Sequence, residues 1–177
     1  MENTILRDLV YDARSGCLTF KGTRYLLIRP ETIVALHKAV EADLGDRAGH
    51  LLVQGGRTGG ALSARRYRET FNLDTRQVVE FMVRMGREIG WGEFALEHLD
   101  QEHHELVISV GRSPFAEAYG PSGTSVCHLI AGVVGGLAEG VFEGPVVVSE
   151  TACVAAGGPR CRFEARGTGP LNERGSG

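Results

Sequence analysis

Three cysteines and one glutamate near the C-terminus constrain this chain more than any other feature. Cys153 and Cys161 bracket a turn rich in glycine and proline (CVAAGGPRC), Glu150 ends the strand before that turn, and Cys127 lies at the first turn of a preceding helix. Three thiolates and one carboxylate can form a closed tetrahedral zinc site, which is typical of structural zinc. Spacing alone leaves two alternatives open, a Cys153–Cys161 disulfide or buried thiols without a metal.

Helix geometry bears on which residues can belong to this cluster. His128 is an alternative fourth ligand, but adjacent side chains on a helix point about 100° apart, so His128 cannot easily share a site with Cys127. A helix N-terminus also favours the thiolate form of Cys127. The fourth cysteine, Cys17, falls outside the pattern, and we interpret it as a free thiol.

Apolar periodicity predicts an α+β chain. Helical spacing predicts helices over residues 30–44, 47–67, 74–89 and 125–141, with a short helix or turn at 114–119. Strands are expected at 17–20, 24–28, 94–99, 104–110, 145–150 and 160–165. The hairpin over 94–110 should present Phe94, Leu96, His98, His104, Leu106, Ile108 and Val110 on one face. The order of elements predicts a mostly antiparallel sheet packed against a bundle of about four helices.

A length of 177 residues fits one domain. We expect an N-terminal arm at 1–14, a ligand-binding domain at 15–166 and a disordered tail at 167–177. Glycine is twice as frequent as usual, at 25 residues. Glycines at 55, 56, 59 and 60 and at 132, 136 and 140 indicate close packing of helices, and the second series could face the sheet or a dimer seam.

Charge and hydropathy exclude several classes of protein. A net charge of −3 argues against a general nucleic-acid-binding protein. The longest apolar stretch, residues 129–138, is half of the ~20 residues that a membrane helix needs. The first ten residues carry Glu2, Arg7 and Asp8, which is not a secretory signal. We therefore expect a cytoplasmic protein without a membrane span.

Several motifs together resemble the 4-vinyl-reductase domain family. They are a cysteine opening a glycine-rich helix (CHLIAGVVGGLAEG), a strand running into ETACVAAGGPRC, the aromatic Phe163, and upstream RYLLIRPETIVAL and Gly-Trp-Gly. The resemblance covers residues 15–166. That family includes small hydrocarbon-binding proteins, a bacteriochlorophyll-biosynthesis accessory protein, and sensory domains of phenol- and xylene-responsive activators. It shares the fold of the Bet3-type transport-complex subunits, the NO-signalling and Golgi-transport ligand-binding type.

The resemblance implies a site. Zinc would be held structurally by Cys127, Glu150, Cys153 and Cys161. A small apolar ligand would lie between sheet and helices, against Val78, Phe81, Met82, Met85, Trp91, His104, Leu106, Ile108 and Val148. The alternative is that these residues are ordinary core. The histidine and tryptophan that bind the phenol hydroxyl in phenol-sensing members fall near Val78 and Leu106, which are apolar here, so a fully apolar or larger ligand is expected.

These observations favour a non-catalytic sensor or carrier for a hydrophobic or aromatic molecule. The resemblance implies a homodimer, and output would pass through a partner protein. One alternative is an accessory protein of tetrapyrrole or bacteriochlorophyll synthesis that binds a porphyrin intermediate. Another is a structural subunit of an assembly. Reduction by this chain alone is disfavoured, because it has no dinucleotide fingerprint and no nucleophile with a paired base.

Overall fold

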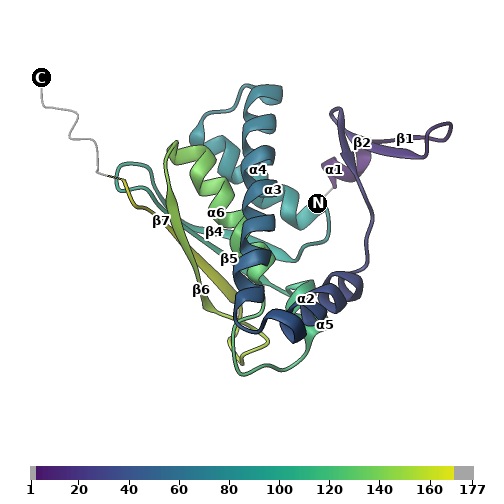
Figure 1. The fold of residues 1–177 in the computed structure, drawn as a ribbon. Helices are drawn as coiled ribbons and strands as arrows, with labels where there is room; N and C mark the ends of the chain where they lie inside the picture. Colours follow the sequence, from purple (N-terminus) through teal and green to yellow (C-terminus); the bar gives the residue numbers. More distant parts are fainter. Residues whose placement is uncertain (1–2, 170–177) are drawn as a thin grey trace, which may run out of the picture.

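The computed structural model describes residues 3–169, which form six helices and seven strands (Figure 1). The helices are α1 (Thr4–Arg7), α2 (Pro30–Leu44), α3 (Arg47–Phe71), α4 (Thr75–Glu88), α5 (Pro114–Tyr119) and α6 (His128–Phe142). The strands are β1 (Leu9–Asp12), β2 (Cys17–Phe20), β3 (Thr23–Tyr25), β4 (Glu93–Asp100), β5 (Glu105–Gly111), β6 (Val146–Ala152) and β7 (Cys161–Gly167). Within the described range, no helix is both long and apolar enough to cross a bilayer.

Two antiparallel sheets organise the chain, with strand orders β1-β2-β3 and β4-β5-β7-β6. Helix α6 lies against the larger sheet, and α3 packs along α6 (Figure 1). This confirms the predicted α+β fold with antiparallel pairing. The expected strand at 24–28 is shorter than predicted, because β3 ends at Tyr25 and the next three residues pair with no strand.

The glycines of α3 and α6 let the two helices touch backbone to backbone. A Cβ atom built on Gly136 would lie 2.0 Å from the carbonyl oxygen of Arg57, far inside any allowed contact. The glycines in this contact are Gly56, Gly60, Gly132 and Gly136. The predicted close packing is therefore present, but the 132/136 series faces α3 and not the sheet. Gly55 and Gly59 face open space instead.

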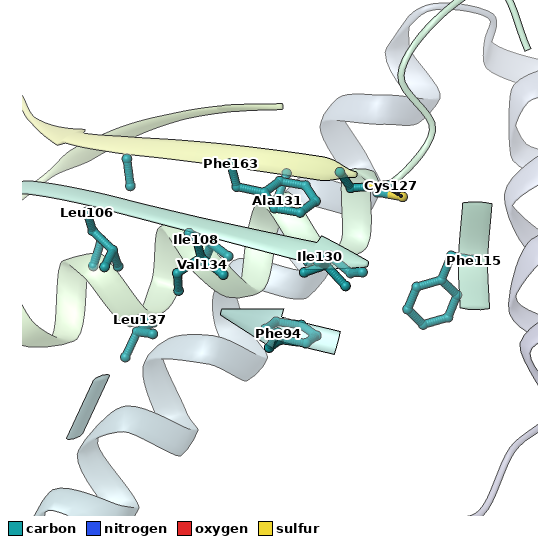
Figure 2. Close-up of a cluster of buried hydrophobic side chains, with 14 of the residues drawn as sticks. Phe94, Leu106, Ile108, Phe115, Cys127, Ile130, Ala131, Val134, Leu137 and Phe163 are labelled. Carbon is teal, nitrogen blue, oxygen red and sulfur yellow. Dashed lines mark hydrogen bonds between the residues drawn. The ribbon is translucent and has the colours of Figure 1, made fainter. Parts of the chain in front are cut away.

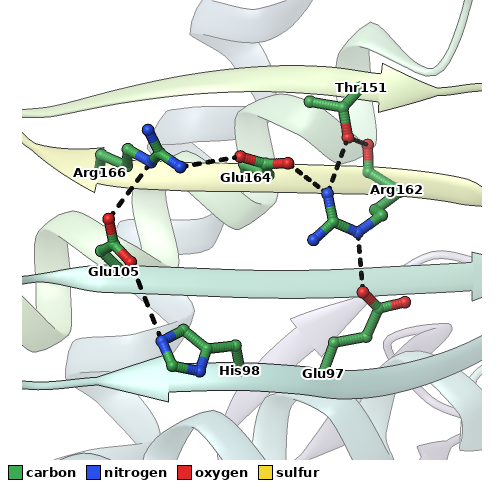
Figure 3. Close-up of polar contacts among 7 residues, drawn as sticks. All are labelled: Glu97, His98, Glu105, Thr151, Arg162, Glu164 and Arg166. Atoms are coloured by element: carbon green, nitrogen blue, oxygen red, sulfur yellow. Dashed lines mark hydrogen bonds and ion pairs between the residues drawn. The ribbon is translucent and has the colours of Figure 1, made fainter.

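A bulge in β4 changes which residues face the core on either side of it. Leu96 pairs with Ile108, but His98 pairs with Val107, so one extra residue, Glu97, is accommodated between them. His98 consequently lies on the outer face near Glu105, where Figure 3 also shows Glu97, Arg162, Glu164 and Arg166. The prediction that His98 shares the inward face is wrong, and Leu99 packs against the core in its place.

The inner face of the larger sheet and α6 form one apolar core (Figure 2). The sheet contributes Phe94, Leu106, Ile108 and Phe163, and α6 contributes Ile130, Ala131, Val134 and Leu137. All eight are at least 95% buried. This packing holds the start of α6 against the end of β6 and the start of β7, where the cysteine cluster lies.

The small-sheet region, residues 3–29, is packed much less completely. Ile5 and Phe20 are buried against Tyr67, Phe81 and Met85. The following segment, residues 26–28, leaves its three apolar side chains between 57% and 87% exposed. Leu9 of β1 pairs with Phe20 of β2, so residues 9–12 of the expected arm at 1–14 belong to this sheet, and residues 1–2 lie outside the described part of the chain. The expected tail begins where β7 ends, and residues 170–177 lie outside the described part of the chain.

Candidate metal centre and apolar cavities

Four side chains from three separate segments meet at one end of the larger sheet. Cys127 is the N-cap of α6, Glu150 lies near the end of β6, Cys153 follows that strand, and Cys161 begins β7. Their candidate ligand atoms all lie within 4.8 Å of one another. The structure thus brings together all four residues that the sequence predicts as metal ligands.

The sulfur spacing is that of metal ligands. Sγ of Cys161 lies 3.5 Å from Sγ of Cys127 and 4.0 Å from Sγ of Cys153. Tetrahedral zinc with Zn–S bonds of roughly 2.3 Å requires sulfur atoms about 3.8 Å apart. A disulfide needs about 2.05 Å, and all three thiols are free here. The geometry therefore favours a shared cation over the Cys153–Cys161 disulfide.

Glu150 supplies a further test of fit. Its Oε2 accepts the backbone N–H of Cys127 at 2.9 Å, whereas its Oε1 is buried and has no hydrogen-bond partner among the described residues. A buried carboxylate oxygen without a partner is costly. A cation between the three sulfur atoms would give Oε1 a ligand, so this donor set fits a metal.

The turn after β6 holds Cys153 in place. The carbonyl oxygen of Cys153 accepts the N–H of Gly158 at 2.8 Å, and a Cβ at Gly158 would lie only 2.9 Å from that oxygen. The N–H of Val154 donates to Sγ of Cys161 at 3.4 Å. The glycine-rich sequence between the cysteines therefore has a structural role, because it closes the turn around the cluster.

The protonation of the cluster reflects burial and mutual contact. Burial raises the pKa of Glu150 to about 8, and the neighbouring Cys153 thiol adds to the increase. Contact with Cys153 and Cys161 raises the pKa of Cys127, whereas contact with Cys127 and Cys161 lowers the pKa of Cys153. A divalent cation would hold all three cysteines as thiolates and release their protons.

This arrangement suits a structural role for a metal. All three cysteines are at least 98% buried. Four protein ligands complete a tetrahedral shell and leave no position for water or substrate. His128, the alternative ligand, contacts other groups: its ring lies 5.3 Å from the ring of His37, and a Cβ at Gly49 would be 3.1 Å from its Nε2.

The residues predicted to line a ligand pocket are distributed over several places. Val78, Leu106 and Ile108 are fully buried in the main core. Phe81 belongs to the second cluster under the small sheet. Val148 contacts Gly135 at the edge strand. His104 has a φ of +54° in the β4–β5 turn and stacks on Phe142 at 5.1 Å. It therefore lies at the opposite end of the hairpin from Trp91, and the two cannot share a compact site.

Two apolar cavities lie elsewhere. Cavity A, of about 290 Å³, lies between the small-sheet region and the body, and its lining includes Leu27, Ile33, Trp91, Phe115 and Leu129. Of the predicted pocket residues, only Trp91 belongs to this lining, and residues 26–28 were assigned to a strand. The three consecutive apolar residues before Pro30 were the available signal, since a strand open to solvent would alternate.

Cavity B, of about 240 Å³, lies between α3 and α4. Three of the predicted pocket residues, Met82, Met85 and Trp91, line it together with Gly59 and Phe94. Tyr25, Ile89 and Trp91 contribute to both cavities. Among the described residues that line either cavity, none carries a charge.

Comparison with solved structures places this fold in a known class. The phenol-responsive sensory domain of the transcription activator PoxR, solved with phenol, superposes with a TM-score of 0.82 at 18% identity, covering 96% of this chain and 89% of that chain. A trafficking protein particle complex subunit 3 from Naegleria fowleri, covalently bound to palmitic acid, gives 0.55 at 14% identity, covering 81% and 98%. A vinyl-4-reductase family protein from Methanocaldococcus jannaschii gives 0.53 at 17% identity, covering 84% and 86%. At these identities the likeness shows a shared fold.

The family comparison is narrower and agrees with the fold. Residues 106–167 match the model of the 4-vinyl-reductase domain. This stretch runs from β5 to the end of β7 and contains the whole cysteine cluster. The match confirms the family resemblance that the motifs indicate. A search of curated protein sequences finds no match.

Proposed function

We propose that this protein is a non-catalytic binding module, a sensor or carrier, for a small hydrophobic molecule. The observation that carries the proposal is the pair of adjoining cavities with no charged residue in their described lining. Pockets that are mostly apolar with a few polar groups are how proteins usually bind small ligands. The PoxR sensory domain solved with phenol supports the same class of function.

The cluster of Cys127, Glu150, Cys153 and Cys161 binds zinc in this proposal, and the zinc is structural. Thiolates prefer zinc over magnesium or calcium, and a saturated tetrahedral shell excludes catalysis at the metal. The three free thiols also suit a reducing compartment, which supports the cytoplasm as the location.

A homodimer completes the proposal, with output passing to a partner protein. The three consecutive apolar side chains at 26–28 support it, because monomeric proteins rarely expose such contiguous apolar surface. Leu27→Asp should reduce the dimer fraction in light-scattering chromatography, whereas Leu62→Asp, on an exposed apolar position of α3, should not. Equal effects of both variants would argue against this interface.

Native mass spectrometry of protein purified from its own host, with metal analysis of the same sample, tests the function. We expect one zinc per chain and a co-purifying apolar molecule that heat or organic solvent releases. A protein with zinc that binds no apolar compound, in native spectra or in titrations with alkanols and simple aromatics, would contradict the binding function. A protein without metal would contradict the zinc assignment.

A further inference from the structure

Cavities A and B share one wall. Trp91 lies in that wall between two glycines with positive φ angles, Gly90 and Gly92, and its ring meets Phe115 edge-on at 5.4 Å. Tyr25 belongs to the same wall, and its hydroxyl is hydrogen-bonded to that of Tyr67. Ile89 is the third residue that lines both cavities, so the two cavities adjoin at Tyr25, Ile89 and Trp91. A molecule that occupies both cavities would therefore pass beside Trp91.

The volumes favour a ligand longer than one ring. A cavity of roughly 150 Å³ already holds benzene. Cavity A alone is about 290 Å³ and cavity B about 240 Å³. A single six-membered ring would leave most of this apolar space without contacts, and interior space that neither water nor ligand fills is unfavourable.

The polar groups of the wall are few and neutral. Beside Tyr25 and Trp91, cavity B adds only the hydroxyl-bearing Ser63. Burial raises the pKa of Tyr25, so its hydroxyl stays protonated at neutral pH. No cation is present in the described lining to pair with a carboxylate or phosphate, and burying an unpaired charge is strongly unfavourable.

From this geometry we propose that one unbranched alkyl chain with a single uncharged polar group occupies both cavities, passing Trp91. The inference rests on the proposed function and specifies the ligand class of the same site. A long-chain alcohol, aldehyde or ester has the required chemistry. Each additional methylene that enters apolar space should tighten binding about fourfold, until both cavities are filled.

A series of n-alkanols from six to fourteen carbons tests the ligand class. Trp91 is the only tryptophan of the chain, so its fluorescence reports binding at the shared wall directly. Alkanols do not absorb in the same range, and cyclohexanol provides a compact control. We expect affinity to rise with length well beyond six carbons, and cyclohexanol to bind no better than hexanol.

A pair of glycine variants tests whether both cavities are used. Gly59 lines cavity B, and a Cβ there meets nothing within 4 Å, so Gly59→Phe can fill the cavity without straining α3. Gly55→Phe, one turn earlier and equally open, is the matched control. Gly59→Phe should weaken dodecanol binding at least tenfold and leave hexanol binding unchanged. Gly55→Phe should change neither, and thermal melts of both variants confirm folding.

The outcomes separate this inference from the function it rests on. If cyclohexanol binds and alkanol affinity stops rising at six carbons, the ligand is compact, and the inference is wrong while the binding function stands. The same holds if Gly59→Phe, correctly folded, leaves dodecanol binding intact. If neither alkanols nor rings bind, including aromatic ones measured by calorimetry, the proposed function fails as well.

Discussion

The larger sheet with α6 buries its apolar side chains almost completely, whereas the small-sheet region leaves many of its own exposed. Leu106, Ile108 and Phe163 of the larger sheet are at most 1% exposed. In the small-sheet region, Leu26 and Leu27 are 77% and 87% exposed, and the surface beside them opens into cavity A. The first region is a packed scaffold, and the second leaves apolar surface for something else to cover.

This difference assigns separate tasks to the two regions. The match to the 4-vinyl-reductase domain, residues 106–167, covers the larger sheet from β5 onward and the cysteine cluster but none of the small-sheet region. Stability should therefore depend on the α3–α6 contact and on the cysteine cluster with the metal proposed for it. Ligand choice should depend on residues 3–29 and on the segment around Trp91. The predictions below test this separation, from the largest expected effect to the smallest.

The largest loss of stability should come from Gly136→Val. Its Cβ would lie 2.0 Å from the Arg57 carbonyl oxygen, so the two helices must move apart along their whole contact. We expect a loss of at least about 4 kcal/mol in unfolding free energy, at the upper end for overpacking. Urea unfolding followed by circular dichroism measures it. Gly55→Ala, in open space on α3, should instead gain about 0.5–1 kcal/mol. Similar effects of the two variants would contradict the close contact.

Cys153→Ser tests whether a metal bound by the cysteine cluster stabilises the fold. The variant should lose zinc and about 3 kcal/mol of stability, because a structural zinc contributes directly to folding. At roughly 2–4 °C per kcal/mol, the melting temperature should fall by about 6–12 °C. A chelator should lower the melting temperature of the natural protein toward that of the variant. Cys17→Ser, outside the cluster, should change neither zinc content nor melting.

Much of the fold was accessible from the sequence, because its signals are local. Asp74 and Gln77 form the capping box that starts α4, with hydrogen bonds of 2.8 and 3.0 Å. The glycine-rich turn CVAAGGPRC and the cysteine spacing identified the four clustered residues. These features depend on short-range geometry that residue types report directly.

The rest depends on contacts that no local pattern encodes. The bulge at Glu97 moves His98 to the outer face, although the alternation of residues 94–99 continues across it. The sequence left the partner of the Gly132–Gly136 series open between the sheet and another copy, whereas in the structure it is α3. Cavity A is formed by segments more than 80 residues apart, such as Leu27 and Phe115, so the apolar run at 26–28 could indicate one side of it but not the other.

A matched pair of leucine and isoleucine truncations compares the two regions directly. Ile108→Ala, in the core under α6, should lose about 2–4 kcal/mol because it removes buried methyl groups and leaves a cavity. Leu27→Ala, at 87% exposure, should stay within about 0.5 kcal/mol in the monomer. Urea unfolding at low protein concentration measures both. A large loss for Leu27→Ala under those conditions would show that the small-sheet region is as tightly packed as the scaffold.

The smallest effect should be a change in acid sensitivity at His37, which is buried in α2. Burial lowers the pKa of His37, although the nearby Glu41 carboxylate raises it; Lys38, His128 and Tyr119 also face or adjoin this ring. A folded-state pKa below the ordinary value of about 6.5 means that the unfolded chain binds the proton first. The stabilising contribution is therefore complete above pH 6.5 and is lost as the pH falls from there toward the folded-state pKa.

His37→Gln should make the unfolding free energy decline less between pH 7.5 and 5 than in the natural protein. Ala35→Gln, exposed on the same helix, should leave that slope unchanged. A steeper acid decline in His37→Gln would mean that His37 is held in its charged form by Glu41.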